Sequence, residues 1–325
     1  MAVAEIHSRV MASRLHLIAS DPTDGGPAGR VDAALRDVVS YLRHLEDRWS
    51  RFIPTSDISR INALGPTGGG VLSVDPSTLT LLGAMIEGYQ VTAGRFDPTV
   101  LRAVIAEGYS ASHLDPDLVC QVPAATMWAS ASLHDLELDP CANTVTVPAG
   151  LVVDPGGIGK GLAADLAVAR LLDAGVAGAM VEIGGDLAMG GVPVDPAGWL
   201  VDVEHPDPAD GLLCALAISG GGVATSSTRS RRWTRDGVER HHQIDPVTER
   251  SSSTDLDAVT VIASAAWLAE VHATAALAAG SGDAVAYLDG HGLSGIAVPR
   301  ASAGCSVLST GDLAGIDMRP RSGAR

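Results

Sequence analysis

The sequence predicts an α+β fold, with mixed or antiparallel sheets flanked by helices. Strand-like apolar runs and helical apolar spacings follow one another along the 325 residues, but without the regular strand–helix repeat of a parallel doubly wound sheet. No internal repeat and no composition break marks a linker. We therefore expect one domain over residues 13–310, with a flexible N-terminal segment at 1–12 and a flexible tail at 311–325.

The first half of the chain contains two helices with clear sequence signals. Apolar residues from Val31 to Trp49 recur at helical spacing, which predicts an amphipathic helix over about 30–50. Asp75-Pro76 is typical of an N-cap followed by the first helical residue, and this second helix should run to about Thr92. The other expected elements are a strand around 14–19, a polar loop with a capping-type start at 56–62, a helix opening at 95–99, and short strands at 133–138 and 144–147.

In the second half, the expected elements follow a glycine-dense turn. An Ala/Leu-rich helix should run from this turn to about Asp173. Arginine-rich residues 229–240 resemble a basic hairpin, which either is simply solvated, receives an acidic partner or touches a phosphate. The remaining expected elements are strands at 179–183, 199–204, 212–218 and 258–263, and a helix from 264 to 280.

Composition limits the class of protein. Apolar residues make up 46% of the chain, yet no stretch is long enough to span a membrane, and the N-terminus lacks a signal-peptide core. We therefore expect a cytoplasmic protein. The four cysteines are scattered without a CxxC spacing, so the sequence indicates neither a zinc site nor a disulfide framework. A net charge of −16 argues against nucleic acid as a partner, and an anionic ligand would need a metal ion or a local basic group.

The central turn is the strongest candidate for such a basic group. A β-branched run ends at Asp154, passes through glycines and enters a helix at Lys160, the only lysine among 22 basic residues. Glycines allow close approach to a ligand, and the following helix start offers N–H groups and a positive dipole end to an anion. A compact ammonium fits such a loop better than a broad guanidinium does. The alternative is an ordinary strand–turn–helix junction with an incidental lysine.

Three further patterns could carry chemistry. Gly159 to Ala164 matches a GxGxxG/A fingerprint with Glu182 about 20 residues later, which is typical of dinucleotide sites but weak without neighbouring strand–helix repeats. Glu270 and Thr274 share a helix face and offer the oxygen ligands that Mg²⁺ prefers, although an isolated Glu is commonly a solvated charge. His242, three residues before Asp245, could be an oriented base or part of a polar turn.

Taken together, eight segments in order resemble the ApbE family of FAD:protein FMN transferases. The resemblance runs from about residue 11 to 280. Its central signature is Asp154 to Asp165, which is similar to the family's Asp-x-Gly-(Gly/Ala)-Ile-Ala-Lys-Gly-x-Ala-x-Asp. The other matching segments are Met11-Ala12-Ser13, residues 49–62, Arg95-Phe96-Asp97-Pro98-Thr99, Val181-Glu182-Ile183-Gly184-Gly185-Asp186, Val223-Ala224-Thr225-Ser226, His242-Gln243-Ile244-Asp245-Pro246 and Ala269-Glu270 with Ala273-Thr274-Ala275.

The resemblance implies a single ApbE-like domain with a central flavin-binding cleft. It also implies Mg²⁺-dependent transfer of FMN from FAD to a Thr or Ser hydroxyl of an acceptor flavoprotein, with release of AMP. Lys160 would support the phosphates, and we propose His242 as the base. Phe52 would stack on the flavin ring, and the Gly157 carbonyl, Glu270 and Thr274 would hold Mg²⁺. The implied FAD contacts are Met11, Phe52, Arg95, Phe96, Asp97, Asp154, Lys160, His242 and Ile244.

The sequence departs from the family pattern at three of these segments. Gly159 stands where Ala is usual, Glu182 where the family has Asn, and Glu270 where it usually has Asp. Glu182 is expected to add negative charge near the site. The alternatives that remain are a Mg²⁺-dependent FAD pyrophosphatase, a flavin-binding protein with weak or no transfer, and, more remotely, a dinucleotide-dependent oxidoreductase. The sequence identifies neither the acceptor protein nor the oligomeric state.

Overall fold

The structure is a computed structural model that describes residues 2–21, 29–112, 115–124, 131–303 and 306–313. It has the α+β architecture that the sequence predicts. The chain forms two compact units: unit 1 comprises 1–42, 160–230 and 253–325, and unit 2 comprises 43–159 and 231–252. We expected one domain over 13–310. Because each unit is built from segments distant in sequence, no single linker separates them, and composition could not have revealed the division.

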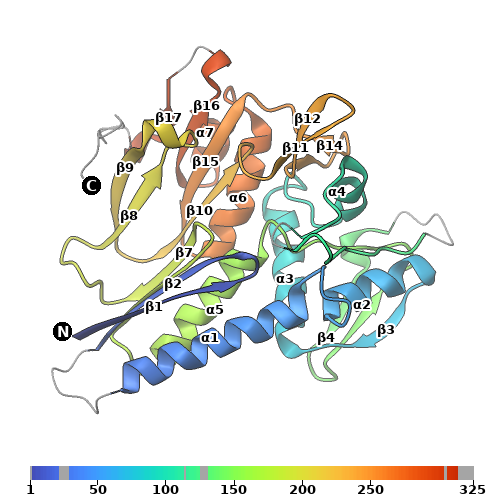
Figure 1. The fold of residues 1–325 in the computed structure, drawn as a ribbon, viewed down its shortest axis with the longest axis horizontal. Coiled ribbons are helices and arrows are strands. Elements are labelled where there is room, and N and C mark those ends of the chain that lie inside the picture. Colours follow the sequence, from blue (N-terminus) through green and yellow to red (C-terminus); the bar gives the residue numbers. More distant parts are fainter. Residues whose placement is uncertain (1, 22–28, 113–114, 125–130, 304–305, 314–325) are drawn as a thin grey trace. The chain divides into compact units, whose positions relative to one another are not determined.

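Unit 1 is built on an eight-stranded sheet, shown with its helices in Figure 1. Its strands lie in the order β1-β2-β6-β7-β10-β15-β16-β17, and every neighbouring pair is antiparallel. This topology rules out the dinucleotide-binding alternative, which requires parallel strands with crossover helices. The strands are β1 (Ala2–Val10), β2 (Ser13–Asp21), β6 (Gly178–Ile183), β7 (Asp186–Gly191), β10 (Gly221–Ser227), β15 (Leu256–Ala263), β16 (Ser294–Pro299) and β17 (Leu308–Ser309).

The N-terminal segment differs from expectation. Residues 1–12 were predicted to be flexible, but β1 pairs with β2 in register from Ala2–Asp21 to Val10–Ser13. The two-residue turn between them, Met11-Ala12, has φ values of 51° and 55°, the left-handed pair that a tight hairpin requires. The charges that suggested fraying alternate along β1 and lie on its exposed side, so they belong to one face of an edge strand.

The two faces of the unit 1 sheet are covered by different elements. Helices α5 (Gly159–Asp173) and α6 (Ala266–Ala279) cover one face, where Val168 approaches Gly190 of β7 and Ala266 approaches Gly222 of β10. The hairpin of β8 (Trp199–Glu204) and β9 (Leu212–Ile218) covers the other face and contributes Trp199 to a core with Met180. Helix α7 (Ala284–Gly290) packs with α6.

Unit 2 combines helices with short strands. The predicted helices are present as α1 (Arg30–Trp49), whose last turns belong to this unit, α3 (Pro76–Val91), capped by Asp75 as expected, and α4 (Leu101–Glu107). The strands form a three-stranded sheet in the order β3-β5-β4 and two hairpins. They are β3 (Gly70–Ser73), β4 (Glu137–Asp139), β5 (Thr144–Val147), β11 (Arg232–Arg235), β12 (Val238–His241), β13 (Ile244–Asp245) and β14 (Arg250–Ser251).

The predicted polar loop at 56–62 is wrong, because this segment forms helix α2 (Asp57–Leu64). Ser56 is its N-cap and accepts a hydrogen bond from the Ser59 N–H at 3.0 Å. The segment is polar but not solvated, because Asp57 is buried and accepts hydrogen bonds from Arg60 at 2.8 Å and from Thr78 at 3.0 Å. Ile58 and Ile61 supply the buried helix face.

The last described residues form a short 3₁₀ turn at Gly311–Leu313, and the rest of the predicted tail lies outside the described residues. Throughout the described part of the chain, the helices are too short or too polar to cross a membrane. The cytoplasmic location stays a prediction.

Candidate functional site

The predicted flavin-site residues are divided between the two units. In unit 1, Lys160 lies in the first turn of α5, and in unit 2, Asp154 ends the run that precedes this helix. Unit 1 holds Met11, Lys160, Glu270 and Thr274; unit 2 holds Phe52, Arg95, Phe96, Asp97, Asp154, Gly157, His242 and Ile244.

The unit 1 group is an ionic cluster centred on Lys160, in the first turn of α5. Its Nζ donates to Asp186 Oδ2, at the start of β7, and to Glu270 Oε1 on α6 at 3.0 Å. The other Glu270 oxygen accepts the Gly161 backbone N–H at 2.8 Å. Asp186 and Glu270 are buried, and the Lys160 side chain is 21% exposed. The only lysine and the distant Glu270 are therefore in direct contact.

Burial and charge act against each other in this cluster. Burial by itself would lower the pKa of Lys160, but the carboxylates of Asp186 and Glu270 outweigh it and hold the pKa above its usual range. Burial raises the pKa of Glu270 above that of an ordinary glutamate, although the Lys160 ammonium opposes this rise. The ammonium is therefore firmly protonated, and its charge is held beside the start of α5.

Asp186 is a site residue that the sequence reasoning missed. Gly184 and Gly185 have φ values of 64° and 99° and form the hairpin turn between β6 and β7. This turn places Asp186 on the face of β7 that α5 covers, the same face as Gly190. The Gly-Gly-Asp segment was the available signal, since it was part of the family resemblance but received no role.

Glu182 lies on the opposite face of the sheet. It pairs with Leu187, which packs in the core beneath β8 and β9, whereas the next residue, Ile183, pairs with Asp186 on the face that α5 covers. Successive side chains of a strand alternate between faces. Glu182 therefore does not share the sheet face of Asp186, and its expected addition of negative charge near the site stays a prediction.

Helices α5 and α6 cross at Gly161, which positions Glu270. A Cβ atom on Gly161 would lie 2.6 Å from the Ala266 carbonyl oxygen, so only glycine permits this approach. Asp165, one turn later, accepts the backbone N–H groups of Ala266 and Trp267 at 2.9 Å each and so caps α6 from α5. Burial raises the pKa of Asp165 to about 6. Lys160, Gly161 and Asp165 thus each have a separate physical role.

The oxygen donors of the predicted metal site are of the type that a hard divalent cation prefers. Thr274 follows Glu270 by one helical turn, and its hydroxyl lies 3.1 Å from the Ser226 hydroxyl on β10. With the carboxylate of Asp186, unit 1 thus presents two carboxylates and two hydroxyls, which is the donor chemistry that Mg²⁺ prefers. The metal role of Gly157, Glu270 and Thr274 stays a prediction.

In unit 2, the run before the central turn is held by a side chain rather than by a strand ladder. Leu151, Val152 and Val153 are buried but belong to no assigned strand. The Asn62 side chain accepts the Val153 N–H at 2.7 Å and donates to the Val153 carbonyl at 2.8 Å. The expected strand–turn–helix is thus an Asn-anchored loop followed by a helix.

Asp154 connects this loop to two other predicted segments. Its N–H donates to the Pro98 carbonyl at 2.7 Å, which places it beside residues 95–99. Its carboxylate lies 3.5 Å from Arg51 Nε and accepts the Gly156 N–H at 2.9 Å. The Arg51 guanidinium also lies 4.4 Å from the centroid of the Phe52 ring and so covers one face of it. Arg51 therefore joins Asp154 to Phe52.

The residues of the 95–99 segment have different environments. Phe96 is 3% exposed and packs in the core, as phenylalanine side chains commonly do. Asp97 accepts the Thr99 N–H and hydroxyl, each at 2.7 Å, while Arg95 is exposed. The FAD contacts assigned to Phe52 and to residues 95–97 stay predictions.

His242 and Ile244 lie at the β12–β13 connection. His242 Nε2 is 3.3 Å from the Gln243 side-chain nitrogen. The Asp245 carboxylate accepts the Val247 N–H at 2.9 Å and the Thr248 hydroxyl at 3.1 Å, so it closes the polar turn that the sequence left open as an alternative. The role of His242 as a base stays a prediction.

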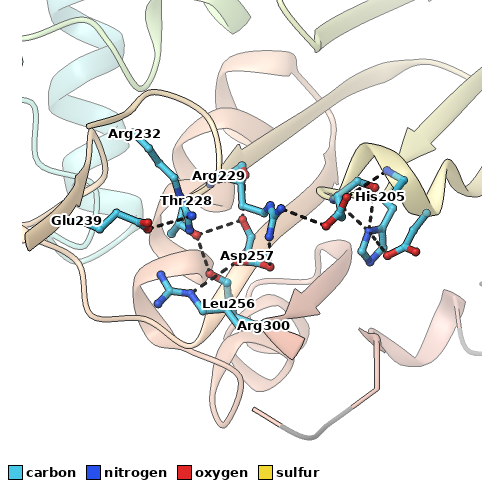
Figure 2. Close-up of polar contacts among 12 residues, drawn as sticks. His205, Thr228, Arg229, Arg232, Glu239, Leu256, Asp257 and Arg300 are labelled. Carbon is cyan, nitrogen blue, oxygen red and sulfur yellow. Dashed lines mark hydrogen bonds and ion pairs between the residues drawn. The ribbon is translucent and has the colours of Figure 1, made fainter. Parts of the chain in front are cut away.

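The arginine-rich segment is largely neutralised within the chain. Figure 2 shows Arg229 between Asp257 and a second carboxylate, that of Asp207, at 3.4 and 3.2 Å. In unit 2, Arg232 pairs with Glu239 at 2.9 Å across the β11–β12 hairpin. These contacts favour an ion-paired hairpin over a surface reserved for an acidic partner.

A cavity of about 450 Å³ lies elsewhere in unit 1, between the end of β15, helix α6 and the start of β16. Its lining includes His272 and His291 but none of the predicted flavin contacts. Its position therefore gives no support to a flavin site.

Comparison with known proteins assigns the family. The ApbE family profile matches residues 11–297. The chain is 30% identical over 268 residues to FAD:protein FMN transferase from Treponema pallidum, covering 78% of this chain and 73% of that protein. It is 27% identical over 246 residues to FAD:protein FMN transferase from Vibrio cholerae, covering 75% and 72%.

Solved structures agree on the fold. The ApbE protein from Thermotoga maritima superposes with a TM-score of 0.77 at 24% identity, covering 97% of this chain and 99% of that one. The flavinyl transferase ApbE from Pseudomonas stutzeri, in its apo form, also gives 0.77 at 24% identity, covering 99% and 98%. With the family profile matching most of the sequence, the chain belongs to the ApbE family.

Proposed function

We propose that this protein is a FAD:protein FMN transferase that moves FMN from FAD to a Thr or Ser hydroxyl of an acceptor flavoprotein and releases AMP. The relatives named above carry this activity in their names, and the chain matches them over most of its length. The observation that carries the proposal is the contact of Lys160 with Asp186 and Glu270 at the start of α5. This contact brings together a protonated ammonium, which can support phosphate oxygens, and two carboxylates, which can hold a metal ion.

Different residues of the chain are proposed to carry the separate steps of the transfer reaction. The acceptor hydroxyl attacks the phosphorus on the FMN side of the diphosphate, the bond to the AMP phosphate breaks, and AMP leaves with that bridging oxygen. An imidazole nitrogen of His242 takes the hydroxyl proton. The Lys160 ammonium and the N–H groups at the start of α5 support phosphate oxygens as negative charge shifts toward the leaving group.

Phe52 and Asp154 would orient the FMN half. Arg51 already covers one face of Phe52, so we propose that the flavin ring stacks on the other. The carboxylate of Asp154 is held by Arg51 and the Gly156 N–H, which limits its freedom before FAD binds. The remaining FAD contacts that we propose are Met11, Arg95, Phe96, Asp97 and Ile244.

Mg²⁺ is the proposed metal, held by the Gly157 carbonyl, Glu270 and Thr274. Bound there, it would supply Lewis-acid polarisation of the diphosphate and neutralise charge on AMP. The donor set in unit 1, with two carboxylates and two hydroxyls, suits this ion better than a softer one. The substitution of Glu270 for the family's usual Asp preserves the donor oxygens.

The test is to incubate the protein with FAD, Mg²⁺ and an acceptor flavoprotein, and to follow AMP by chromatography and acceptor-bound flavin by mass spectrometry. AMP together with flavinylated acceptor supports transfer. AMP with free FMN would instead identify a pyrophosphatase that uses water as the nucleophile. Tight FAD binding without AMP would identify a flavin-binding protein.

Two variants connect the reaction to the cluster. Lys160→Ala and Glu270→Ala should each weaken FAD turnover, because each removes one partner of a buried ion pair beside the proposed diphosphate. Glu182→Gln is the matched control, since this carboxylate lies on the opposite sheet face and its removal should leave turnover unchanged. Undiminished turnover in both cluster variants would remove these residues from the site.

A further inference from the structure

A second group of metal-ligating side chains lies on the β1–β2 hairpin. Among the described residues, Glu5, His7 and His16 form one group whose potential ligand atoms all lie within 4.8 Å of one another. None of them belongs to the proposed flavin site. Two imidazoles and a carboxylate are the ligand types of open zinc sites, which use three protein ligands and leave a fourth position for water.

The strand register brings these three side chains together. His7 and His16 are directly paired across β1 and β2, and their rings stack with centroids 4.1 Å apart. Glu5 lies two residues before His7 on β1 and therefore points to the same face of the sheet. The group is consequently fixed by a hairpin ladder rather than by a loop.

The distances between the ligand atoms are close to those of a metal site. Glu5 Oε2 lies 3.0 Å from His16 Nε2 and 3.8 Å from His7 Nε2. Two ligands of one tetrahedral zinc ion lie about 3.3 Å apart, given metal–ligand bonds of about 2.0–2.1 Å. The two observed distances bracket this value, so small side-chain rotations are sufficient to seat an ion.

The charges nearby are mixed. Glu182 on β6 pairs in register with His16, so its carboxylate adds negative charge in the same row of the sheet. Arg9 and Arg14 form the next pair on this face, toward the hairpin turn. Attraction of a hard cation by net charge alone is therefore weak, and the imidazole nitrogens favour a borderline transition metal over Mg²⁺.

We propose that Glu5, His7 and His16 bind one divalent transition-metal ion of the Zn²⁺ type, which clamps the edge strand β1 to β2. Because β1 contacts only β2 in the sheet order, a cross-strand ion holds the edge of the sheet. The clamp also stiffens the hairpin that ends in Met11, a predicted FAD contact.

The test is calorimetric titration of the full-length protein with ZnCl₂ in excess Mg²⁺, so that hard oxygen sites are saturated. Cys141 and Cys305 are first replaced by Ser, because thiols bind zinc. We expect one Zn²⁺ per chain. His7→Gln, His16→Gln and Glu5→Gln should each weaken this binding by more than about 10-fold, since even outer-shell changes cost about 10–100-fold in metal sites.

A matched control is His44→Gln, which removes another histidine that pairs with a single carboxylate, Asp75, at 3.0 Å. It should leave zinc binding unchanged. As a second measurement, Zn²⁺ should slow amide hydrogen exchange in β1, and the His7→Gln/His16→Gln double variant should lose this effect. Absence of zinc binding, or equal zinc binding in the double variant, would overturn the proposal whether or not the protein transfers FMN.

Discussion

Gly161→Ala tests how the site is held together. The added Cβ would lie 2.6 Å from the Ala266 carbonyl oxygen, 2.7 Å from its carbon and 2.8 Å from the Trp267 nitrogen. All three atoms are backbone, so no side chain can turn away, and α5 and α6 must separate. This separation would also lengthen the 2.8 Å hydrogen bond from the Gly161 N–H to Glu270.

The magnitude follows from comparison with Gly159→Ala in the same helical turn. A Cβ on Gly159 would lie 3.5 Å from the Pro155 Cβ, an ordinary van der Waals contact. Both substitutions gain at most about 1 kcal/mol of helix propensity, so this gain cancels in their difference. Overpacking costs about 1–3 kcal/mol, and Gly161→Ala should therefore be less stable than Gly159→Ala by about this amount.

The assay is urea unfolding of both variants and the wild type, followed by FAD turnover at a temperature where all three are folded. Gly161→Ala should lose both stability and turnover, whereas Gly159→Ala should keep both. Equal stability of the two variants would refute the inference that Gly161 sets the distance between α5 and α6.

Three other predictions concern caps and charges. Asp165→Ala removes the cap of α6 and should cost about 1–2 kcal/mol of unfolding free energy at pH 4. Burial raises the Asp165 pKa from 3.8 to about 6, so folding disfavours ionisation of this carboxyl group. The stability advantage of the wild type over the variant should therefore shrink between about pH 4 and 6, which urea unfolding at both pH values can measure. Lys160→Arg keeps the positive charge but replaces a compact ammonium with a planar guanidinium, and initial-rate assays should show roughly 10–100-fold lower turnover of FAD. A wild-type rate would argue against the idea that only the smaller ammonium fits between Asp186 and Glu270. Glu107→Gln weakens contacts with Arg240 at 3.2 Å and with the Ser251 N–H at 3.1 Å. It should lower the free energy of unfolding, measured in urea, by about 1–3 kcal/mol. An unchanged free energy of unfolding would mean that other contacts hold the strands β12 and β14.

Much of the fold was predictable because its signals are local. Helical apolar spacing identified α1, and the Asp75-Pro76 pair identified the start of α3. Helices and strands were harder to predict where their polar side chains face solvent or form hydrogen bonds with residues distant in sequence. The polar residues of α2 predict a loop, but Asp57 is buried against Thr78. The charges of β1 predict a frayed segment, but they form one face of a strand that pairs with β2.

The sequence predicted individual residues of the site, but it did not predict the contacts that join them. Lys160 stood out as the only lysine, and the structure places it beside Glu270, 110 residues later. The sequence could not reveal that Asp186 completes the ion-pair cluster or that Gly161 and Asp165 serve the α5–α6 crossing, because these contacts depend on tertiary packing. The sheet face on which Glu182 lies depends likewise on the register of β6 and β7, which the Gly184-Gly185 turn sets.

The most direct measurement of the central claim is AMP release from FAD, quantified against flavin covalently attached to a Thr-bearing acceptor. We expect equimolar AMP and attached flavin in the presence of Mg²⁺, neither product after chelation, and severe loss of both in Lys160→Ala. Attached flavin that forms at the same rate without a divalent ion, or with Lys160 removed, would contradict the account.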